Sequence, residues 1–525
     1  MRVLKALVSG VRRYRVWACF AALFGALLAV YYPSFSHPPR SDYWPALYFF
    51  YRIDAIGGPL KWACLLAHDP LINATFRPLS FLMSYGEHLV FGSRYVFPQV
   101  LNFILYCVSI VLLYKTALVF SLRRGIALAL LFLFAFLFSH FDIVCWGFHS
   151  HIILSFCLFL CAFLLYDRYE RSGNKLIFAG IVFLSLCGML LYEVFFLWPL
   201  AFVLLYWVKR FSRGQGLLSP APSRAGSTIA LVVAIYAVYA ALFCIDRMFK
   251  AYRGPGISLS PLFLFGALPP SVFLVFLNIF YNNILINLLP WLAYPLDTAD
   301  NNLNMSGLIG RVPVDIDVLT YAGGGVVIAV LVLAAVWLYR QKNRMLFGAF
   351  VFFMYLLLSE LFILFWFKSL VNSSLYNLTQ FRFQYIPNAF VLLSLACFAQ
   401  SLENRRTIIA KAAFLLLAVS LVLNIRSSKA GVLFLTRELA PVRAIITNIA
   451  RGLDEQKITP DKKLFIDREV VKKLPSLCWN NEMGQRCMRG TYEWLFPPRQ
   501  IDCFSGREEA AWIIDQRTLK VTAKK

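Results

Sequence analysis

Two acidic residues lie at the edges of apolar segments, where a carboxylate could do chemistry. Asp42 belongs to the stretch PPRSDYW, which follows an apolar run ending at Tyr32. Glu193 belongs to GMLLYEVFFLWPL, between two apolar runs with almost no loop between them. A carboxylate beside a membrane is either an ordinary solvated residue or a general base. An acid within the membrane boundary is costly, so Glu193 is predicted either to be functional or to pair with a neighbouring arginine.

The composition predicts a helical membrane protein. Of the 525 residues 60% are hydrophobic and 15% are charged, whereas soluble globular chains are about half apolar and a quarter charged. Apolar runs of about 20 residues, the length that crosses a bilayer, recur along the chain. The formal net charge of +24 comes mostly from cations in short loops between these runs, so we predict no nucleic-acid partner. The predicted fold class is all-α, a polytopic helical bundle integral to a bacterial inner membrane, a plasma membrane or the endoplasmic reticulum.

The cations orient the predicted spans. The positive-inside rule assigns six cationic clusters to the cytoplasm, at residues 2–15, 123–124, 168–175, 209–224, 340–344 and 405–411. Between them lie eleven predicted spans: 17–34, 96–120, 125–141, 150–166, 176–192, 193–208, 227–246, 317–339, 346–366, 384–401 and 407–425. The stretch 262–293, with two prolines and several asparagines, is predicted as a re-entrant or interfacial helix, which gives about 11–13 membrane helices.

This topology divides the chain into two parts. Residues 1–425 form a transmembrane domain with two long outer loops, 35–95 and 247–316, and residues 426–525 form a small extracytoplasmic tail. All six histidines then fall on outer loops or outer span ends. His149 and His151 are two residues apart, and this spacing does not place both imidazoles on one helix face. The sequence therefore does not favour a metal site, and we assign no cofactor.

Four segments combine arginine, proline, aromatic and acidic residues in a fixed order. They are FRPLSFLMSYGEHLVFGSRYVFPQVLNFILY (76–106), CWGFHSHIILSFCLFLCAFLLY (145–166), LLYEVFFLWP (190–199) and QFRFQYIPNAFVLL (380–393). In this order they resemble segments of the GT-C class of membrane glycosyltransferases that use polyprenyl-phosphate sugars, in particular the protein O-mannosyltransferase-like group. The resemblance implies a GT-C-like bundle with its active site on the extracytoplasmic side.

The resemblance also implies roles for single residues. Asp42 matches the acidic position of the first outer loop, although the group has paired acids there. His149 and His151 replace a polar Arg/Asp turn of the group, so the resemblance does not specify the acceptor or the donor sugar. The other matched positions are Arg77, Asn102, Glu193, Arg382 and Tyr385.

The chemistry of such a transfer needs one base and one or more cations. A base removes the proton of the acceptor hydroxyl, and cations hold the departing phosphate. Asp42 is the predicted base, with Asp54 the next candidate. Arg382 and Arg77 are predicted to bind the donor phosphate through their guanidinium forks, the alternative being that they only anchor the chain at the interface. The predicted cavity and acceptor residues are Glu193, His149, His151, Asn102 and Tyr385.

The expected partners are a polyprenyl-phosphate-sugar donor, a glycan, lipid or protein acceptor, and membrane lipid. Two other classes stay open. An O-antigen-type ligase or polymerase would use cationic and histidine residues of an outer loop and would not need Asp42. A lipid-linked-sugar transporter would favour internal repeats and broken helices near the midplane, and no such repeat is detectable in the sequence.

Overall fold

The computed structural model describes residues 2–38, 76–91, 96–214, 224–251, 318–371, 385–403 and 408–454, together with a few shorter pieces. The shorter pieces are residues 50, 53, 58, 61–62 and 65 and three strands near the C-terminus. Asp42, Asp54, Arg382 and the predicted re-entrant stretch 262–293 lie outside the described residues.

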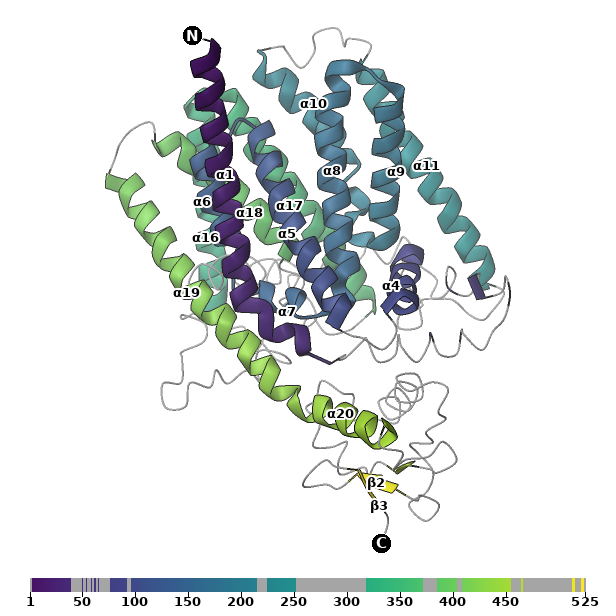
Figure 1. Cartoon of the computed structure of the whole chain (residues 1–525). Helices are drawn as coiled ribbons and strands as arrows, with labels where there is room; N and C mark the ends of the chain where they lie inside the picture. The colour runs from purple at the N-terminus through teal and green to yellow at the C-terminus, as the bar shows by residue number, and fades with distance from the viewer. Residues whose placement is uncertain are drawn as a thin grey trace.

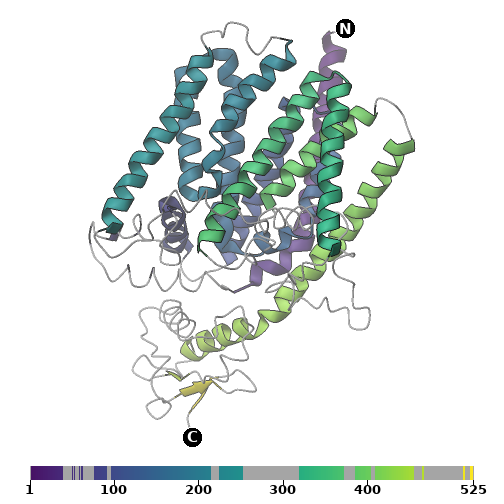
Figure 2. The ribbon, with the colours of Figure 1, turned by 180° about the vertical axis from the view of Figure 1, so that it is seen from behind.

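The described chain is a bundle of long helices with short helical turns at one end (Figures 1 and 2). Its first half comprises α1 (Arg2–Tyr31), η1 (Tyr32–Ser36), α4 (Pro78–Phe91), α5 (Val96–Val119), α6 (Arg124–Ala135), α7 (His140–Val144), η2 (Gly147–His149), α8 (Ser150–Ser172) and α9 (Lys175–Leu191). Its second half comprises η3 (Glu193–Leu197), α10 (Leu200–Ser212), α11 (Arg224–Ala251), α16 (Val318–Arg340), α17 (Arg344–Val371), α18 (Tyr385–Glu403), α19 (Ile408–Glu438) and α20 (Ala440–Asp454).

In the part of the chain that the structure describes, seven helices are long and apolar enough to cross a membrane, which confirms the prediction of a multi-pass membrane protein. They are Val16–Ser36, Val96–Val119, Gly147–Ser172, Ala225–Asp246, Arg344–Ile363, Tyr385–Leu402 and Leu415–Arg437. Three shorter apolar helices, Arg124–Ala135, Lys175–Leu191 and Gly324–Arg340, coincide with three further predicted spans. The remaining predicted span, 193–208, divides into η3 and the 13-residue α10, because Pro199 separates them.

The helix ends next to the cationic clusters lie at the same end of the bundle as the N-terminus (Figure 1). We call this end the cationic end. At this end Lys209 Nζ of α10 lies 2.7 Å from Glu170 Oε2 of α8. The turn between α8 and α9 is built by Gly173, whose φ of +66° suits a residue without Cβ, and by Asn174, whose side chain caps α9 by accepting the Leu176 N–H at 2.8 Å.

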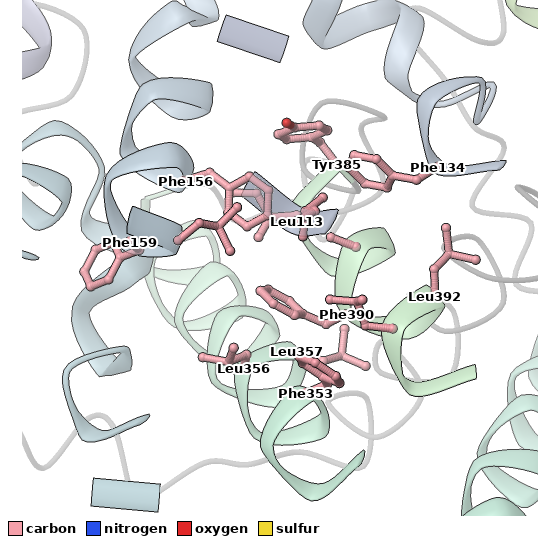
Figure 3. Packing of buried hydrophobic residues seen from close by; sticks show 14 of the residues in the cluster. Leu113, Phe134, Phe156, Phe159, Phe353, Leu356, Leu357, Tyr385, Phe390 and Leu392 are labelled. Atoms are coloured by element: carbon pink, nitrogen blue, oxygen red, sulfur yellow. The ribbon is translucent and has the colours of Figure 1, made fainter. Parts of the chain in front are cut away.

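Aromatic side chains fill the core between α5, α8, α17 and α18 (Figure 3). Phe156 of α8 and Phe390 of α18 meet edge to face with ring centroids 6.0 Å apart, and Trp198 packs 5.3 Å from Phe390. Close helix contacts rely on glycine: a Cβ on Gly188 would lie 2.6 Å from the Phe159 ring. Because Gly188 has no Cβ, α9 can approach Phe159 of α8 closely at this point.

Two expectations about the C-terminal part need correction. The last span was predicted to end at residue 425, but α19 continues to Glu438. Arg426 and Lys429 are typical of a loop in the sequence. In the structure they lie on the exposed face of α19, whereas Ser428 and Val432 are buried on its other face. The predicted domain boundary at 425/426 therefore falls inside α19.

The tail also contains strands, which the all-α prediction did not include. β1 (Leu464–Phe465), β2 (Trp512–Ile514) and β3 (Val521–Ala523) form a sheet in the order β1-β2-β3. β1 and β2 are parallel, and β2 and β3 are antiparallel. The sheet lies beyond α20, at the end of the molecule opposite the cationic end (Figure 1).

The predicted orientation can be tested by labelling single cysteines from outside the cell. Thr447 of α20 and Ser172 of α8 are both exposed and lie toward opposite ends of the molecule. In intact cells we expect a membrane-impermeant maleimide to label Thr447→Cys above the unsubstituted background and to label Ser172→Cys only after permeabilisation. The reverse pattern would put the tail in the cytoplasm.

Candidate functional site

Several of the predicted site residues meet at the end of the bundle opposite the cationic end. Arg77 comes directly before α4, and Glu193 begins η3. The Arg77 Nε donates to Glu193 Oε2 and its Nη2 donates to Glu193 Oε1, so the guanidinium and the carboxylate form a two-point fork. The sequence analysis predicted that Glu193 is either functional or paired with a neighbouring arginine. The structure shows such a pair, and its arginine is Arg77, the residue predicted to bind the donor phosphate.

Apolar neighbours place Arg77 in this position. Phe76 is buried and packs edge to face against Tyr239 and Phe243 of α11, each with ring centroids 5.6 Å away. Pro78, whose fixed φ suits the first residue of a helix, starts α4 immediately after Arg77. The guanidinium lies over the Tyr192 ring, 4.8 Å from its centroid, which adds a cation–π contact to the ion pair.

Glu193 is held by the turn that follows α9. Its side chain is 2% exposed, whereas that of Arg77 is 16% exposed. The backbone of Tyr192 is extended, and Phe195 and Trp198 then fix the turn in the core by packing against Phe159 at 5.0 and 5.2 Å. A buried carboxylate in so rigid a turn is stable only with a close positive partner, which Arg77 supplies.

The segment that carries the two histidines is clamped by α5. The Asn102 side chain donates to the carbonyl oxygens of Ile143 at 2.6 Å and Val144 at 3.0 Å, and Gln99 donates to Cys145 O at 3.1 Å. Gly147 lies so close to α5 that a Cβ on it would meet the Pro98 backbone at 3.0 Å. Asn102 thus contacts the backbone that leads into the histidines, and this fixes where η2 begins.

His149 and His151 are both buried beside this clamp. The His149 ring centroid lies 4.0 Å from that of Trp146 and 6.3 Å from that of His151. His151 Nδ1 is 2.9 Å from Phe148 O, and because a carbonyl oxygen only accepts, Nδ1 carries the hydrogen of this bond. The His151 ring then meets Tyr192 at 6.2 Å, and Tyr192 is the residue beneath Arg77.

Glu87 is a further acid at this end whose role the sequence reasoning missed. It lies on α4, outside the membrane-spanning helices, and is 6% exposed. Ser150, the residue between the two histidines, donates its hydroxyl hydrogen to Glu87 Oε1 at 2.7 Å. Burial raises the pKa of Glu87 to about 7, and the Ser150 hydrogen bond opposes part of that rise. The sequence signal was an acid within the apolar stretch MSYGEHLVF, which was assigned to a solvated outer loop.

Glu360 is a second acid that the sequence reasoning missed. It is the only acidic residue within α17, and it is 1% exposed. Among the described residues its Oε2 has no hydrogen-bond partner. α17 also contacts η3, where the Tyr355 hydroxyl donates to Leu197 O at 2.8 Å. A lone acid in an apolar span is a candidate functional residue in its own right.

Tyr385 lies in the aromatic core (Figure 3). It is fully buried, its hydroxyl is hydrogen-bonded to Ser109, and its ring is 5.1 Å from His140. His140 in turn lies 2.9 Å from the Tyr106 hydroxyl and 3.4 Å from the Asn388 amide nitrogen. The structure therefore places Tyr385 in a buried network between α5, α7 and α18.

The structure brings together Arg77, Glu193, His149 and His151 and gives Asn102 a supporting contact, while Asp42 and Arg382 lie outside the described residues. In the described part of the chain, no group of three or more His, Cys, Asp or Glu side chains is arranged to hold a metal ion. We call Arg77, Glu87, His149, Ser150, His151, Tyr192 and Glu193 the polar cluster.

Comparison with known proteins adds no family to this description. No protein-family model matches the chain, and no characterised protein matches its sequence.

Proposed function

We propose that this protein is an integral membrane glycosyltransferase. It moves a sugar from a polyprenyl-phosphate donor to an acceptor hydroxyl at the end of the bundle opposite the cationic end. The observation that supports this most is the meeting of Arg77, Glu193 and the His149–His151 turn in one polar cluster. These residues come from three of the four segments on which the sequence resemblance rests, and they are far apart in the chain.

The chemistry of the donor fits a site of this kind. A polyprenyl-phosphate sugar has a charged head on an apolar chain, so its reacting atoms stay near the membrane boundary. A protein that acts on it needs polar groups at that depth, which are otherwise costly there. The buried fork of Arg77 and Glu193 is such a group, and it sits next to the membrane-spanning helix α8 and the shorter apolar helix α9.

Asp42, Arg382 and four members of the polar cluster have roles in the proposed reaction. Asp42 takes the proton of the acceptor hydroxyl, and Arg382 holds the phosphate as the sugar leaves. Glu193 fixes the orientation of the Arg77 guanidinium, which adds positive charge beside the leaving phosphate. His149 and His151 bound the acceptor side of the site, where the resemblance gave no match to the family.

A direct assay tests this proposal. Purified protein in mixed detergent–lipid micelles is given a radiolabelled polyprenyl-phosphate hexose and candidate glycan, lipid or protein acceptors. The expected result is a labelled acceptor with release of one polyprenyl phosphate per sugar. Movement of the labelled lipid between leaflets without release would favour the transporter instead. Use of a diphosphate-linked donor that is unaffected by the loss of Asp42 would favour the ligase.

Replacing Arg382 by Lys tests the proposed phosphate contact. Lysine keeps the charge but cannot present two parallel N–H donors, so we expect the KM for the polyprenyl-phosphate sugar to rise about tenfold while the protein still inserts and folds. Arg443→Lys, at an exposed position of α20, is the matched control and should leave the KM unchanged. A wild-type KM in the Arg382→Lys protein would limit Arg382 to anchoring at the interface.

A further inference from the structure

Helix α4 is attached to the bundle by a polar contact near each of its ends. At its beginning Arg77 is paired with Glu193 of η3. Near its other end Glu87 accepts the hydrogen bond of Ser150, the first residue of α8. Ten residues of chain separate Arg77 from Glu87, which corresponds to about 15 Å along a helix.

Among the described residues, α4 is buried mainly along one face. Phe81 and Tyr85 are 5% and 0% exposed, whereas Leu89 and Val90 are 57% and 74% exposed. A helix of this kind lies in the interface plane, with apolar side chains available to lipid on its outer side. Its position over the bundle depends on the contacts of its buried face, such as the packing of Tyr85 against Phe50 and Trp62, and on the Glu87–Ser150 hydrogen bond.

We propose that Glu87 is a positioning residue for the transfer site: by accepting the Ser150 hydrogen bond it fixes α4 on the start of α8 and so keeps Arg77 in place against Glu193. This inference rests on the proposed function for its effect on activity. The geometric part stands on the contacts themselves, because Ser150 lies directly between His149 and His151. This hydrogen bond therefore connects the helix that follows Arg77 to the segment that carries both histidines.

The ionisation of Glu87 fits this role. Burial raises its pKa to about 7, so near neutral pH a substantial fraction of Glu87 is the uncharged acid. Gln has the same shape as that acid, and its side-chain oxygen can accept from Ser150. Ala removes the acceptor and leaves the buried Ser150 hydroxyl without it.

The test compares five variants by two measurements. The variants are Glu87→Ala, Glu87→Gln, Ser150→Ala, the double variant Glu87→Ala/Ser150→Ala and the control Ser428→Ala. The control removes another buried serine hydrogen bond, 3.0 Å long, from α19 to Phe136 O. The first measurement is the KM and kcat for a polyprenyl-phosphate hexose. The second is hydrogen–deuterium exchange of the α4 backbone in the purified full-length protein, which does not depend on activity.

We expect Glu87→Ala and Ser150→Ala each to raise the KM for the donor about tenfold, because a tenfold change corresponds to the loss of one buried hydrogen bond. The change in kcat should be smaller. The double variant should be no worse than either single one, and Glu87→Gln should restore a near-normal KM. Exchange across α4 should rise in the two disrupted variants and stay unchanged in Ser428→Ala.

Two outcomes overturn the inference. One is normal α4 exchange in both Glu87→Ala and Ser150→Ala, whatever the activity. The other is faster exchange with an unchanged donor KM in a wild-type protein that does transfer sugar. A wild-type protein that transfers no sugar contradicts the proposed function instead, and the exchange experiment then decides alone whether Glu87 fixes α4.

Discussion

An Asp42→Asn protein is expected to insert, fold and bind the polyprenyl-phosphate donor, but to transfer almost no sugar. Asparagine has the size and hydrogen-bonding groups of aspartate but is not basic, so the acceptor hydroxyl would keep its proton. A positioned carboxylate base contributes a rate factor of roughly a hundred to ten thousand. Turnover of a radiolabelled donor by purified protein measures the loss, and donor binding is measured separately by protection against thermal unfolding.

Asp54→Asn is the control for this variant, because Asp54 is the next acid along the same outer loop. We expect it to keep most of the wild-type rate. Near-normal transfer by Asp42→Asn together with lost transfer by Asp54→Asn would move the base to Asp54. Normal transfer by both variants would remove the first-loop acid from the proposed mechanism.

The second large effect is expected when the Arg77–Glu193 fork is broken. Removing one partner leaves the charge of the other, buried or half-buried, without its ion-pair partner, and such a loss destabilises proteins by about 3–5 kcal/mol. Arg77→Ala and Glu193→Ala should therefore lower the unfolding temperature strongly in detergent. The control is Arg171→Ala: its partner is Asp167, but Arg171 is 73% exposed, so its loss should cost at most about 1 kcal/mol.

The double variant Arg77→Met/Glu193→Leu separates stability from function. Apolar side chains of similar volume often replace a buried ion pair without loss of stability, so this protein should regain most of its unfolding temperature. If Arg77 helps to bind the phosphate, the double variant should remain inactive or have a much higher KM for the donor. Full recovery of transfer would make the pair a purely structural contact, and a stable Arg77→Ala protein would contradict the energetic argument.

The spans could be predicted because membrane helices follow hydropathy and the placement of cations, both of which are local properties of the sequence. The ends were less predictable. The stretch Arg426–Lys429 contains two cations and two serines, and only the structure reveals that Ser428 donates to Phe136 O while Arg426 faces outward. The sequence of a polar stretch does not show which side chains are buried. The helical pattern of such a stretch can be recognised only when the residues that pack against it are known.

The sequence singled out several residues of the polar cluster, but it did not indicate how they pair. The acid at 193 stood out because it interrupts an apolar stretch, yet 116 residues separate it from Arg77, and no local pattern connects them. Asn102 was expected in the cavity, and the structure gives it three backbone carbonyls of the segment 143–146. Glu87 went unassigned because its burial depends on α8, a helix more than fifty residues further along the chain.

The lengths of α6 and α10 bear on the membrane around the protein. They have 12 and 13 residues, which correspond to about 18–20 Å of helix, against about 30 Å for the hydrocarbon layer. A span this short is accommodated by thinning of the adjacent lipid, at a modest cost for each ångström of mismatch. The segments next to these helices, residues 136–149 and 192–199, are mostly apolar and buried within the bundle. In liposomes of increasing acyl-chain length the mismatch at α6 and α10 would grow, so the protein should favour thinner membranes.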